Sequence, residues 1–338
     1  MEMKPLKIAG GGLAGLALGL ALRRQGVPVT VIESATYPRH RVCGEFISGI
    51  TDEELESLGM EGLMSGATQL QETLWFDGDH PMLRTSLPNQ ARGISRHLLD
   101  GIMAERFVAH GGALLTGQRF TDPAIEGIVL ATGRPSSESA WIGLKAHFLG
   151  LPLKADLELH LGNGGYVGLT RVEENRVNVS GLFHRTESLT GREHRLAQAA
   201  ADAGLGNLAE RMREAAMVEG SLKGVHRFQL GWQSPTDDAL RIGDAAAMIP
   251  PITGNGMSMA FQSALAAVPA LLDWSRQQIS WHHAKQSIRK SHHTLFARRL
   301  RWARRLQWIL LQPWGRRLCA QAVSRRWVSF ASLYQLVR

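Results

Sequence analysis

The sequence predicts an α/β protein with an interrupted Rossmann-like nucleotide-binding domain, an antiparallel-sheet domain and a C-terminal helical tail. Three observations support this fold class. A glycine-rich turn follows an apolar run near the N-terminus, and a second glycine-rich segment stands about 230 residues later. Much of the chain between them alternates as antiparallel strands do. With 338 residues, the chain can bury one large core or two smaller ones.

The first glycine-rich segment reads Gly10-Gly11-Gly12-Leu13-Ala14-Gly15. It lies between an apolar run at 7–9 and an apolar helix pattern that extends to Arg24. A β-branched run follows and ends at Glu33, 23 residues after Gly10. A strand, a glycine turn, a helix, a strand and an acid within about thirty residues indicate a dinucleotide-binding unit.

The residue types of this unit suit a pyrophosphate. Gly10 permits the tight turn, and Gly12 lets the backbone approach the ligand. Gly15 lets the helix sit close to the strand, and the helix N-terminus favours negative charge. Glu33 is expected to accept hydrogen bonds from an adenosine ribose and to disfavour a 2′-phosphate. The unit therefore suits FAD or NAD better than NADP.

The second glycine-rich segment follows an apolar run at 240–242 and leads into a helix pattern at 256–272. Its predicted cofactor-binding residues are Gly243, Asp244, Pro251, Gly254, Asn255, Gly256 and Met257. This order of glycines, prolines and helix start is typical of a loop that closes over a flavin. Together, the two segments indicate an FAD-dependent oxidoreductase.

The sequence divides into three parts. The runs at 128–130 and 240–242 suit a return to the first sheet, whereas turns at Gly150, 162–165 and 174–175 separate alternating strands. A helix is expected over 188–216 and a strand over 218–230. We predict a nucleotide-binding domain at 1–60, 91–135 and 225–275, a substrate domain at 61–90 and 136–224, and basic C-terminal helices at 276–338.

Charge is unevenly distributed. The chain has a net charge of +8. From Trp274 onward it carries 14 Lys or Arg and no acidic residue, so the part before Trp274 has a net charge of −6. Only Cys43 and Cys319 are present, so no disulfide framework is predicted and the cytoplasm is the expected location. No apolar run reaches the ~18–20 residues that span a bilayer.

The tail combines arginines with apolar and aromatic residues. Its apolar residues recur at helical spacing: Phe296, Leu300, Ala303, Leu306 and Leu310. Six of the nine tryptophans also lie after residue 273. This combination favours a helix on an anionic membrane surface, peripheral to the inner face. The alternative is a helical pair packed on the substrate sheet; nucleic acid is not an expected partner, because the body is acidic.

In their order along the chain, these motifs resemble those of para-hydroxybenzoate-hydroxylase-type flavoproteins over roughly residues 5–270. The shared features are Gly10–Gly15, Glu33, Arg41–Glu45, Ser95-Arg96, Ala131–Gly133 and Gly243–Met257. The segments Cys43–Glu45, Gly165-Tyr166 and Asn178–Gly181 look most like the geranylgeranyl reductase branch.

This resemblance implies roles for several residues. Asp244 would bind the ribityl chain, and the amides of Gly256 and Met257 would face the flavin pyrimidine edge. A helix that starts there would stabilise the anion of the reduced flavin. Arg41 and Arg96 would reach phosphate or ribose, or else lie in solvent as surface charges.

Three departures from the resembling proteins limit which of their reactions can be expected of this chain. The segment at 131–136 lacks the Asp-Gly motif of the hydroxylases, which weakens the case for an NADPH-driven hydroxylase. The Trp-x-Trp-x-Ile-Pro motif of the flavin halogenases is missing from the sequence. Gly168 stands where the reductases carry a bulky ring, which predicts more room beside the flavin or room filled by another side chain.

Cys43 is the first predicted catalytic residue. Its neighbours Arg39, His40 and Arg41 are cationic or can become so, and such neighbours lower a thiol pKa and favour the thiolate. In the resembling reductases this position faces the substrate cavity. The alternative is a small buried thiol that packs under the flavin loop.

Glu45 and Tyr166 are the other predicted catalytic residues. Glu45 would relay a proton or cap the helix near Thr51, and Tyr166 would donate a proton or line the pocket. His147 is expected to be a sheet residue rather than a ligand. No cluster of His, Cys and Asp has metal-ligand spacing, so no metal is predicted.

The preferred function is an FAD-dependent reductase or dehydrogenase that acts on a hydrophobic isoprenoid-, polyketide- or quinone-like substrate by hydride transfer at flavin N5. NAD(P)H is a candidate transient electron donor, because the chain has a single dinucleotide cradle. The alternatives are a flavin monooxygenase that hydroxylates a lipophilic or aromatic substrate, and a membrane-bound flavoprotein electron carrier.

Overall fold

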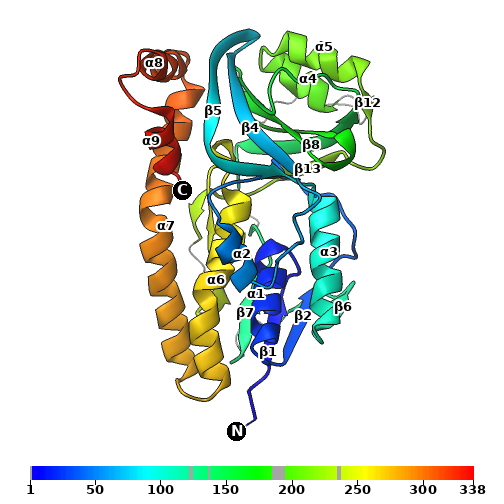
Figure 1. Cartoon of the computed structure of the whole chain (residues 1–338), viewed down its shortest axis with the longest axis vertical. Helices are drawn as coiled ribbons and strands as arrows, with labels where there is room; N and C mark the ends of the chain where they lie inside the picture. Colours follow the sequence, from blue (N-terminus) through cyan, green and yellow to red (C-terminus); the bar gives the residue numbers. More distant parts are fainter. Residues whose placement is uncertain (1, 122–124, 136–137, 185–194, 234–236) are drawn as a thin grey trace.

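The computed structural model describes residues 2–121, 125–135, 138–184, 195–233 and 237–338. In Figure 1 a parallel sheet lies in the lower half of the molecule and a larger, mostly antiparallel sheet lies in the upper half. A long helical pair, α6 (Gly256–Ser275) and α7 (Trp281–Leu311), runs along one side and joins the two halves. This arrangement confirms the predicted fold class.

The parallel sheet is assembled from distant parts of the sequence. Its strands stand in the order β15-β7-β1-β2-β6, and all pairs are parallel. Their bounds are β1 Leu6–Ala9, β2 Val29–Glu33, β6 Ala113–Thr116, β7 Ile128–Leu130 and β15 Leu240–Arg241. Helix α1 (Leu13–Arg24) is buried almost all round because it packs against both α6 and α3 (Arg96–Ala109) as well as the sheet.

The second sheet has two differently covered faces. Its strands are β3 Phe46–Ile47, β4 Thr68–Asp77, β5 His80–Gly93, β8 Trp141–Leu149, β9 Leu157–Leu161, β10 Gly165–Arg171, β11 Val177–His184, β12 Ala216–Met217 and β13 Lys223–His226. Within it, β4 and β9 pair in parallel. Helices α4 (Arg195–Asp202) and α5 (Gly206–Glu214) cover one face, and the opposite face lines a cavity.

Some predicted elements are shorter in the structure. The helix expected over 188–216 is two helices, because the chain turns at Gly204 with a φ of +79°. The part of this prediction at 188–194 lies outside the described residues. The strand expected over 218–230 is limited to β13. The remaining elements are the short helix α2 (Asp52–Ser57) and the ribbon of β14 (Gly231–Trp232) and β16 (Ala247–Met248).

The C-terminal helices are part of the packed molecule. Helix α7 lies along α6, and both α8 (Pro313–Ser324) and α9 (Phe330–Gln335) pack against β5. The apolar stripe predicted to face a membrane is instead buried or half-buried: Phe296, Leu300, Ala303, Leu306 and Leu310 belong to two core clusters. No helix in the described part of the chain is long and apolar enough to cross a bilayer.

Candidate functional site

Two cavities meet beyond the carboxyl ends of β1, β7 and β15, the position at which open parallel sheets bind ligands. The larger cavity has a volume of about 610 Å³ and the smaller about 180 Å³. They share a set of lining residues: Val42, Cys43, Gly44, Phe46, Arg134, Val225, Met248, Pro251 and Gly254. A ligand in one cavity therefore adjoins a ligand in the other.

The first glycine segment forms an open cradle at the larger cavity. A Cβ on Gly10 would lie 2.3 Å from the Ala131 carbonyl oxygen, and one on Gly15 would lie 1.9 Å from the Gly10 carbonyl oxygen, so both positions require glycine. A Cβ on Gly12 would meet nothing nearer than the Arg96 guanidinium at 3.8 Å. Gly12 therefore faces free space beside the N-terminus of α1, as predicted for a pyrophosphate site.

Two arginines flank this space. Arg96 donates two hydrogen bonds to Asp100, of 2.7 and 2.8 Å, and Arg41 lies 3.7 Å from the same carboxylate. Burial, with the charge of Arg96, lowers the pKa of Arg41 to about 10, so both groups stay cationic at neutral pH. The Arg41 Nε makes no hydrogen bond to the described residues. Both arginines can thus receive an anion.

Glu33 lies outside the larger cavity. Its carboxylate accepts hydrogen bonds from the Gly11 and Ala35 amides at 2.8 and 3.0 Å and pairs with Arg39 at 2.7 Å. Although burial opposes ionisation, these partners lower the pKa of Glu33 to about 2. Glu33 therefore fixes the cradle, and its contact with a ribose stays a prediction.

The second glycine segment closes the other side of the larger cavity. Gly243 has a φ of +60°, and its missing Cβ would lie 2.8 Å from Ala14, so the two segments touch. Asp244 lines the cavity; burial raises its pKa, and Arg134, Arg96 and Arg41 oppose that rise. Gly256 and Met257 line it at the N-terminus of α6, a helix of 20 residues whose dipole favours an anion.

Asn255 has a different environment from its neighbours. Its side chain is fully buried, and its Nδ2 donates a 2.5 Å hydrogen bond to the Val337 carbonyl oxygen. It does not line either cavity. Its contribution is therefore to attach the loop to the C-terminal segment.

These residues fit FAD. The open cradle at Gly12, the two arginines and the helix start at Gly256 would hold the pyrophosphate and the flavin, and Asp244 would face the chain between them. A volume of about 610 Å³ falls in the range of cofactor sites, which is about 300–1,000 Å³. Within the described ranges, no group of His, Cys, Asp and Glu could hold a metal ion.

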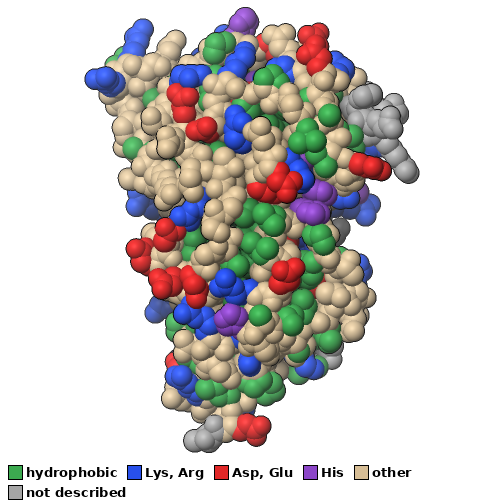
Figure 2. Space-filling model, turned by 45° about the vertical axis from the view of Figure 1, so that its right-hand side comes forward, with side chains coloured by type: hydrophobic (Ala, Val, Ile, Leu, Met, Phe, Trp, Pro, Cys, Tyr) green, Lys and Arg blue, Asp and Glu red, His purple; other side chains and the backbone are tan. Residues whose placement is uncertain are grey.

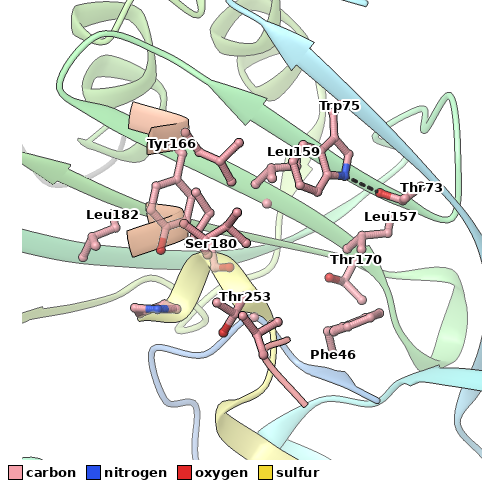
Figure 3. Close-up of a pocket in the computed structure, with 18 of the residues that line it drawn as sticks. Phe46, Thr73, Trp75, Leu157, Leu159, Tyr166, Thr170, Ser180, Leu182 and Thr253 are labelled. Carbon is pink, nitrogen blue, oxygen red and sulfur yellow. Dashed lines mark hydrogen bonds between the residues drawn. The ribbon is translucent and has the colours of Figure 1, made fainter. Parts of the chain in front are cut away.

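The smaller cavity lies on the inner face of the second sheet (Figure 3). Trp75, Leu159, Tyr166 and Leu182 point into it from four neighbouring strands. A few polar side chains accompany them, among them Thr73, which accepts a 3.1 Å hydrogen bond from Trp75 Nε1. The cavity therefore suits an apolar molecule with few polar groups.

Gly168 leaves room in this wall. A Cβ there would lie 3.9 Å from the Ser180 carbonyl oxygen and 4.0 Å from that of Glu158, which are ordinary contacts. No side chain of the described residues fills the space at this distance, so the alternative of added room is the one observed.

The C-terminal helices complete the smaller cavity. The wall includes Leu306 and Leu310 of α7, Cys319, Ala320 and Val323 of α8, and Phe330, Leu333 and Tyr334 of α9. Arg338 stacks on Tyr334, with its guanidinium carbon 3.7 Å from the ring centroid, and donates to Ser48 Oγ and the Thr253 carbonyl oxygen. The alternative of a helical pair packed on the substrate sheet is thus the one observed, for α8 and α9. The sequence did not show that this pair would close a cavity, because no local pattern identifies the side chains that a distant helix covers.

Tyr166 lines the smaller cavity from β10. Burial raises the pKa of its hydroxyl well above the usual value, so the group is protonated at neutral pH. The hydroxyl makes no hydrogen bond of normal geometry to the described residues. Its oxygen is almost inaccessible and interacts with the Ile252 backbone, so its role as a proton donor stays a prediction.

Cys43 lines both cavities, but the thiolate predicted for it is wrong. Burial raises the pKa of the Cys43 thiol, which outweighs the opposing charge of Arg96. Arg39 is engaged by Glu33, and burial lowers the pKa of His40 to about 4, so His40 is neutral. Cys43 is thus a protonated thiol at the junction of the two cavities.

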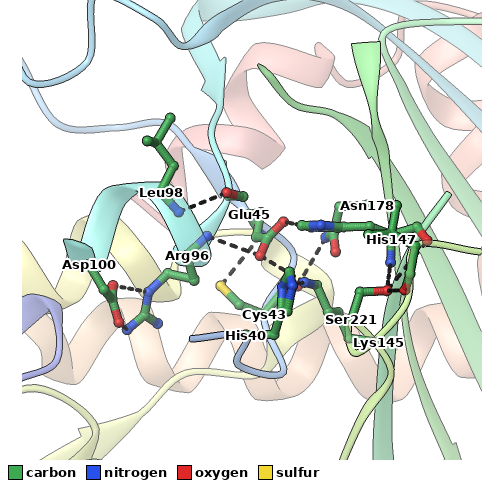
Figure 4. A network of polar contacts seen from close by, with 12 residues as sticks. His40, Cys43, Glu45, Arg96, Leu98, Asp100, Lys145, His147, Asn178 and Ser221 are labelled. Carbon is green, nitrogen blue, oxygen red and sulfur yellow. Dashed lines mark hydrogen bonds and ion pairs between the residues drawn. The ribbon is translucent and has the colours of Figure 1, made fainter. Parts of the chain in front are cut away.

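Glu45 is the centre of a buried polar network (Figure 4). Its carboxylate contacts His147 Nε2 at 2.5 Å and Lys145 Nζ at 3.1 Å, and all three side chains are fully buried. The Arg96 amide donates to the same carboxylate at 3.0 Å. Burial acts to raise the pKa of Glu45, but His147 and Lys145 outweigh it, and the pKa lies below its usual value.

The alternative that Glu45 caps the helix near Thr51 is wrong. Thr51 and Glu54 form that cap with each other, whereas Glu45 lies beside β8. Glu45 has a φ of +54°, a strained conformation for a residue with a side chain. The network that surrounds its carboxylate holds this strained turn, and with it Cys43, in place.

Lys145 and His147 were missed as partners of Glu45. Both lie on β8, and His147 is a sheet residue as predicted. A signal was present, since Lys145 and His147 alternate with Leu144, Ala146 and Phe148 along this strand. That alternation indicates a polar face, but a buried lysine beside a glutamate 100 residues away cannot be deduced from it.

Comparison with known proteins supports the nucleotide-binding unit and the fold. Residues 6–69 match the family model of the pyridine nucleotide-disulphide oxidoreductases. No curated protein sequence matches the chain significantly. Because the family model matches only residues 6–69, it gives no information about the substrate.

Solved structures of several flavin enzymes are similar over almost the whole chain. PqsL of Pseudomonas aeruginosa, in complex with 2-aminobenzoylacetate, has a TM-score of 0.74 at 17% identity and covers 99% of this chain and 100% of its own. The flavin-dependent brominase Bmp2 has a TM-score of 0.77 at 16% identity, with 100% and 93% covered. p-Nitrophenol 4-monooxygenase PnpA from Pseudomonas putida DLL-E4 has a TM-score of 0.75 at 12% identity, with 99% and 96% covered.

The chain has the para-hydroxybenzoate-hydroxylase-type flavoprotein fold. Together with the matched nucleotide-binding unit, this fold supports an FAD-dependent oxidoreductase. The geranylgeranyl reductase branch is not among these similar structures and stays a prediction.

Proposed function

We propose that this protein is an FAD-dependent monooxygenase that hydroxylates a compact lipophilic or aromatic substrate. The observation that carries the proposal is the junction of the two cavities at Cys43, Gly44 and Pro251. It sets an apolar compartment directly against the site that suits a flavin. The similar fold of p-nitrophenol 4-monooxygenase and of the brominase supports oxygen chemistry rather than reduction of a C=C bond.

The size of the smaller cavity supports a compact substrate. Its volume of about 180 Å³ slightly exceeds the ~150 Å³ of an apolar cavity that holds one benzene molecule. A single substituted ring fits such a space. The proposal therefore departs from the isoprenoid reductase preferred on the sequence.

The proposed reaction places one oxygen atom of O₂ into a C–H bond of the substrate and releases the other as water. It requires two electrons and two protons, which a reduced nicotinamide or a separate reductase would supply. FAD, when bound, supplies the activation of oxygen. The chain contributes an apolar compartment that excludes water, with the protonated Cys43 thiol at its junction with the cofactor cavity.

A reductase is the second candidate, and Cys43 is the observation that favours it. A protonated thiol at the junction of the two cavities can give a proton to a carbon atom that receives a hydride. Cys43→Ser would then slow turnover strongly while the flavin content stays unchanged. In the monooxygenase the same variant is expected to retain most of its activity.

The test is oxygen incorporation by the reduced holoprotein. The flavin is photoreduced without oxygen, mixed with ¹⁸O₂ and a panel of substituted phenols and anilines, and the products are analysed by mass spectrometry. Substrate-dependent reoxidation with one ¹⁸O atom in the product supports the monooxygenase. If no panel member gains ¹⁸O, and polyunsaturated lipids gain two hydrogens under anaerobic conditions, the reductase is the function.

A further inference from the structure

We infer that the outward face of α7 and of the start of α8 docks on an anionic lipid surface. This Trp–Arg face consists of Arg298, Arg301, Trp302, Arg305, Trp308 and Trp314, all exposed. The inference does not rest on the apolar stripe of the same helix, because that stripe is buried in the molecule. It also stands apart from the proposed reaction, since the face lies outside both cavities.

The helical geometry separates the two sides of α7. Phe296, Leu300, Ala303 and Leu310 are almost completely buried, whereas Trp302 and Trp308 are 36% and 60% exposed. Trp314, at the start of α8, is 56% exposed, and its ring lies 6.1 Å from that of Trp308. Trp308 of α7 and Trp314 of α8 therefore lie side by side on the outer surface.

The charge of this surface fits an anionic partner. No Asp or Glu occurs after Asp273, and none of the three arginines of the face forms an ion pair within the described part of the chain. The guanidinium carbon of Arg305 lies 5.3 Å from the Trp302 ring centroid. By contrast, the face seen in Figure 2 carries acidic and basic side chains intermixed.

Tryptophan and arginine together indicate lipid rather than another polyanion. Tryptophan is enriched at the level of lipid headgroups, where its ring is apolar and its N–H is hydrated. Each basic side chain close to an anionic leaflet adds to the attraction. Since no helix in the described ranges spans a bilayer, the expected mode is contact with the surface of one leaflet.

The position of α8 gives this contact a consequence for the substrate. Cys319, Ala320 and Val323 of α8 line the smaller cavity, while Trp314 and Leu318 face outward. If the proposed function holds, one helix separates the lipid surface from the substrate compartment. A lipophilic substrate would then enter from the membrane.

The experiment measures binding of the FAD-loaded full chain to vesicles by flotation. Phosphatidylcholine vesicles are compared with vesicles that also contain phosphatidylglycerol. Arg301→Gln/Arg305→Gln is expected to lower the partition coefficient for the anionic vesicles about 30-fold, which corresponds to about 2 kcal/mol. Arg119→Gln/Arg213→Gln removes the same charge from exposed positions elsewhere and should change it little.

The tryptophans are tested separately. Trp308→Ser/Trp314→Ser is expected to lower binding to both kinds of vesicle, whereas Val108→Ser, an exposed apolar residue on α3, should have no effect. Equal losses in the face variants and in their controls would overturn the inference. So would wild-type protein that stays unbound, that self-associates through these tryptophans, or that binds an oligonucleotide in preference to anionic vesicles. Circular dichroism and flavin absorbance establish that each variant is folded.

Discussion

Filling the smaller cavity at Gly168 tests whether it holds the substrate. The missing Cβ of Gly168 has 3.9 Å of clearance, and its φ lies outside the left-handed region, so an L-residue can take this backbone. The phenyl ring of Gly168→Phe would occupy most of the roughly 180 Å³ cavity, since ~150 Å³ holds one benzene. Substrate and side chain would then compete for one volume.

The expected stability of this variant follows from two opposing effects. Burial of the ring contributes about 1.5–3 kcal/mol, and imperfect packing costs about 1–3 kcal/mol. At about 2.1 cal/mol/K per residue, a chain of 338 residues shifts its Tm by roughly 1.4 °C per kcal/mol. The Tm of Gly168→Phe should therefore stay within about 4 °C of the wild type, and its flavin content should be unchanged.

The expected activity of this variant differs sharply from its stability. Exclusion of one apolar ring removes about 3 kcal/mol of binding, so kcat/KM for substrate-dependent oxygen consumption should fall roughly 100-fold. Gly168→Ala is the matched control, because its methyl group leaves the cavity nearly unchanged. Wild-type turnover by a flavin-loaded Gly168→Phe would refute the assignment of this cavity, and Gly168→Leu repeats the test with a smaller side chain.

Three further predictions concern the cofactor cradle and the buried charges. Gly12→Val should fold but bind flavin about 5- to 150-fold more weakly, since its side chain enters the pyrophosphate space; flavin absorbance after dialysis measures this. Glu45→Gln should lower the free energy of unfolding in urea by about 3–5 kcal/mol, because Lys145 stays buried without its partner, and adding Lys145→Met should restore much of it. Glu33, with a folded pKa of about 2 against about 4.5 unfolded, should contribute about 3 kcal/mol above pH 4.5 and lose it as the pH falls to 2; Glu33→Gln should flatten that part of the urea-midpoint profile.

The cradle could be predicted from the sequence because its determinants are local. Gly10, Gly12 and Gly15 lie within six residues. A side chain at Gly10 or Gly15 would clash with the backbone, and one at Gly12 would enter the pyrophosphate space. Gly168 was informative for the same reason, since a missing side chain means space wherever the strand is packed. In both cases the residue type itself carries the structural information.

The reactivity of Cys43 could not be predicted in this way. Arg39 and His40 lie close to Cys43 in the sequence but do not stabilise a thiolate there. Arg39 pairs with Glu33, and burial keeps His40 neutral. Likewise, the ion pair of Glu45 and Lys145 joins residues 100 positions apart. Local charge does not show which groups a fold will desolvate, and desolvation determines these pKa values.

The hydrogen bond from Asn255 to Val337 has a consequence for the synthesis of this protein. The loop over the cofactor cavity is completed by residues more than 80 positions later, and Arg338 reinforces it through the Thr253 carbonyl oxygen. A ribosome adds about 5–20 residues per second, so roughly 15–65 seconds separate the emergence of the Gly10 cradle from that of Val337. Throughout that interval the nascent chain has a cradle without its closing partner. Flavin capture should accordingly follow the synthesis of residues 337 and 338, which hold this loop.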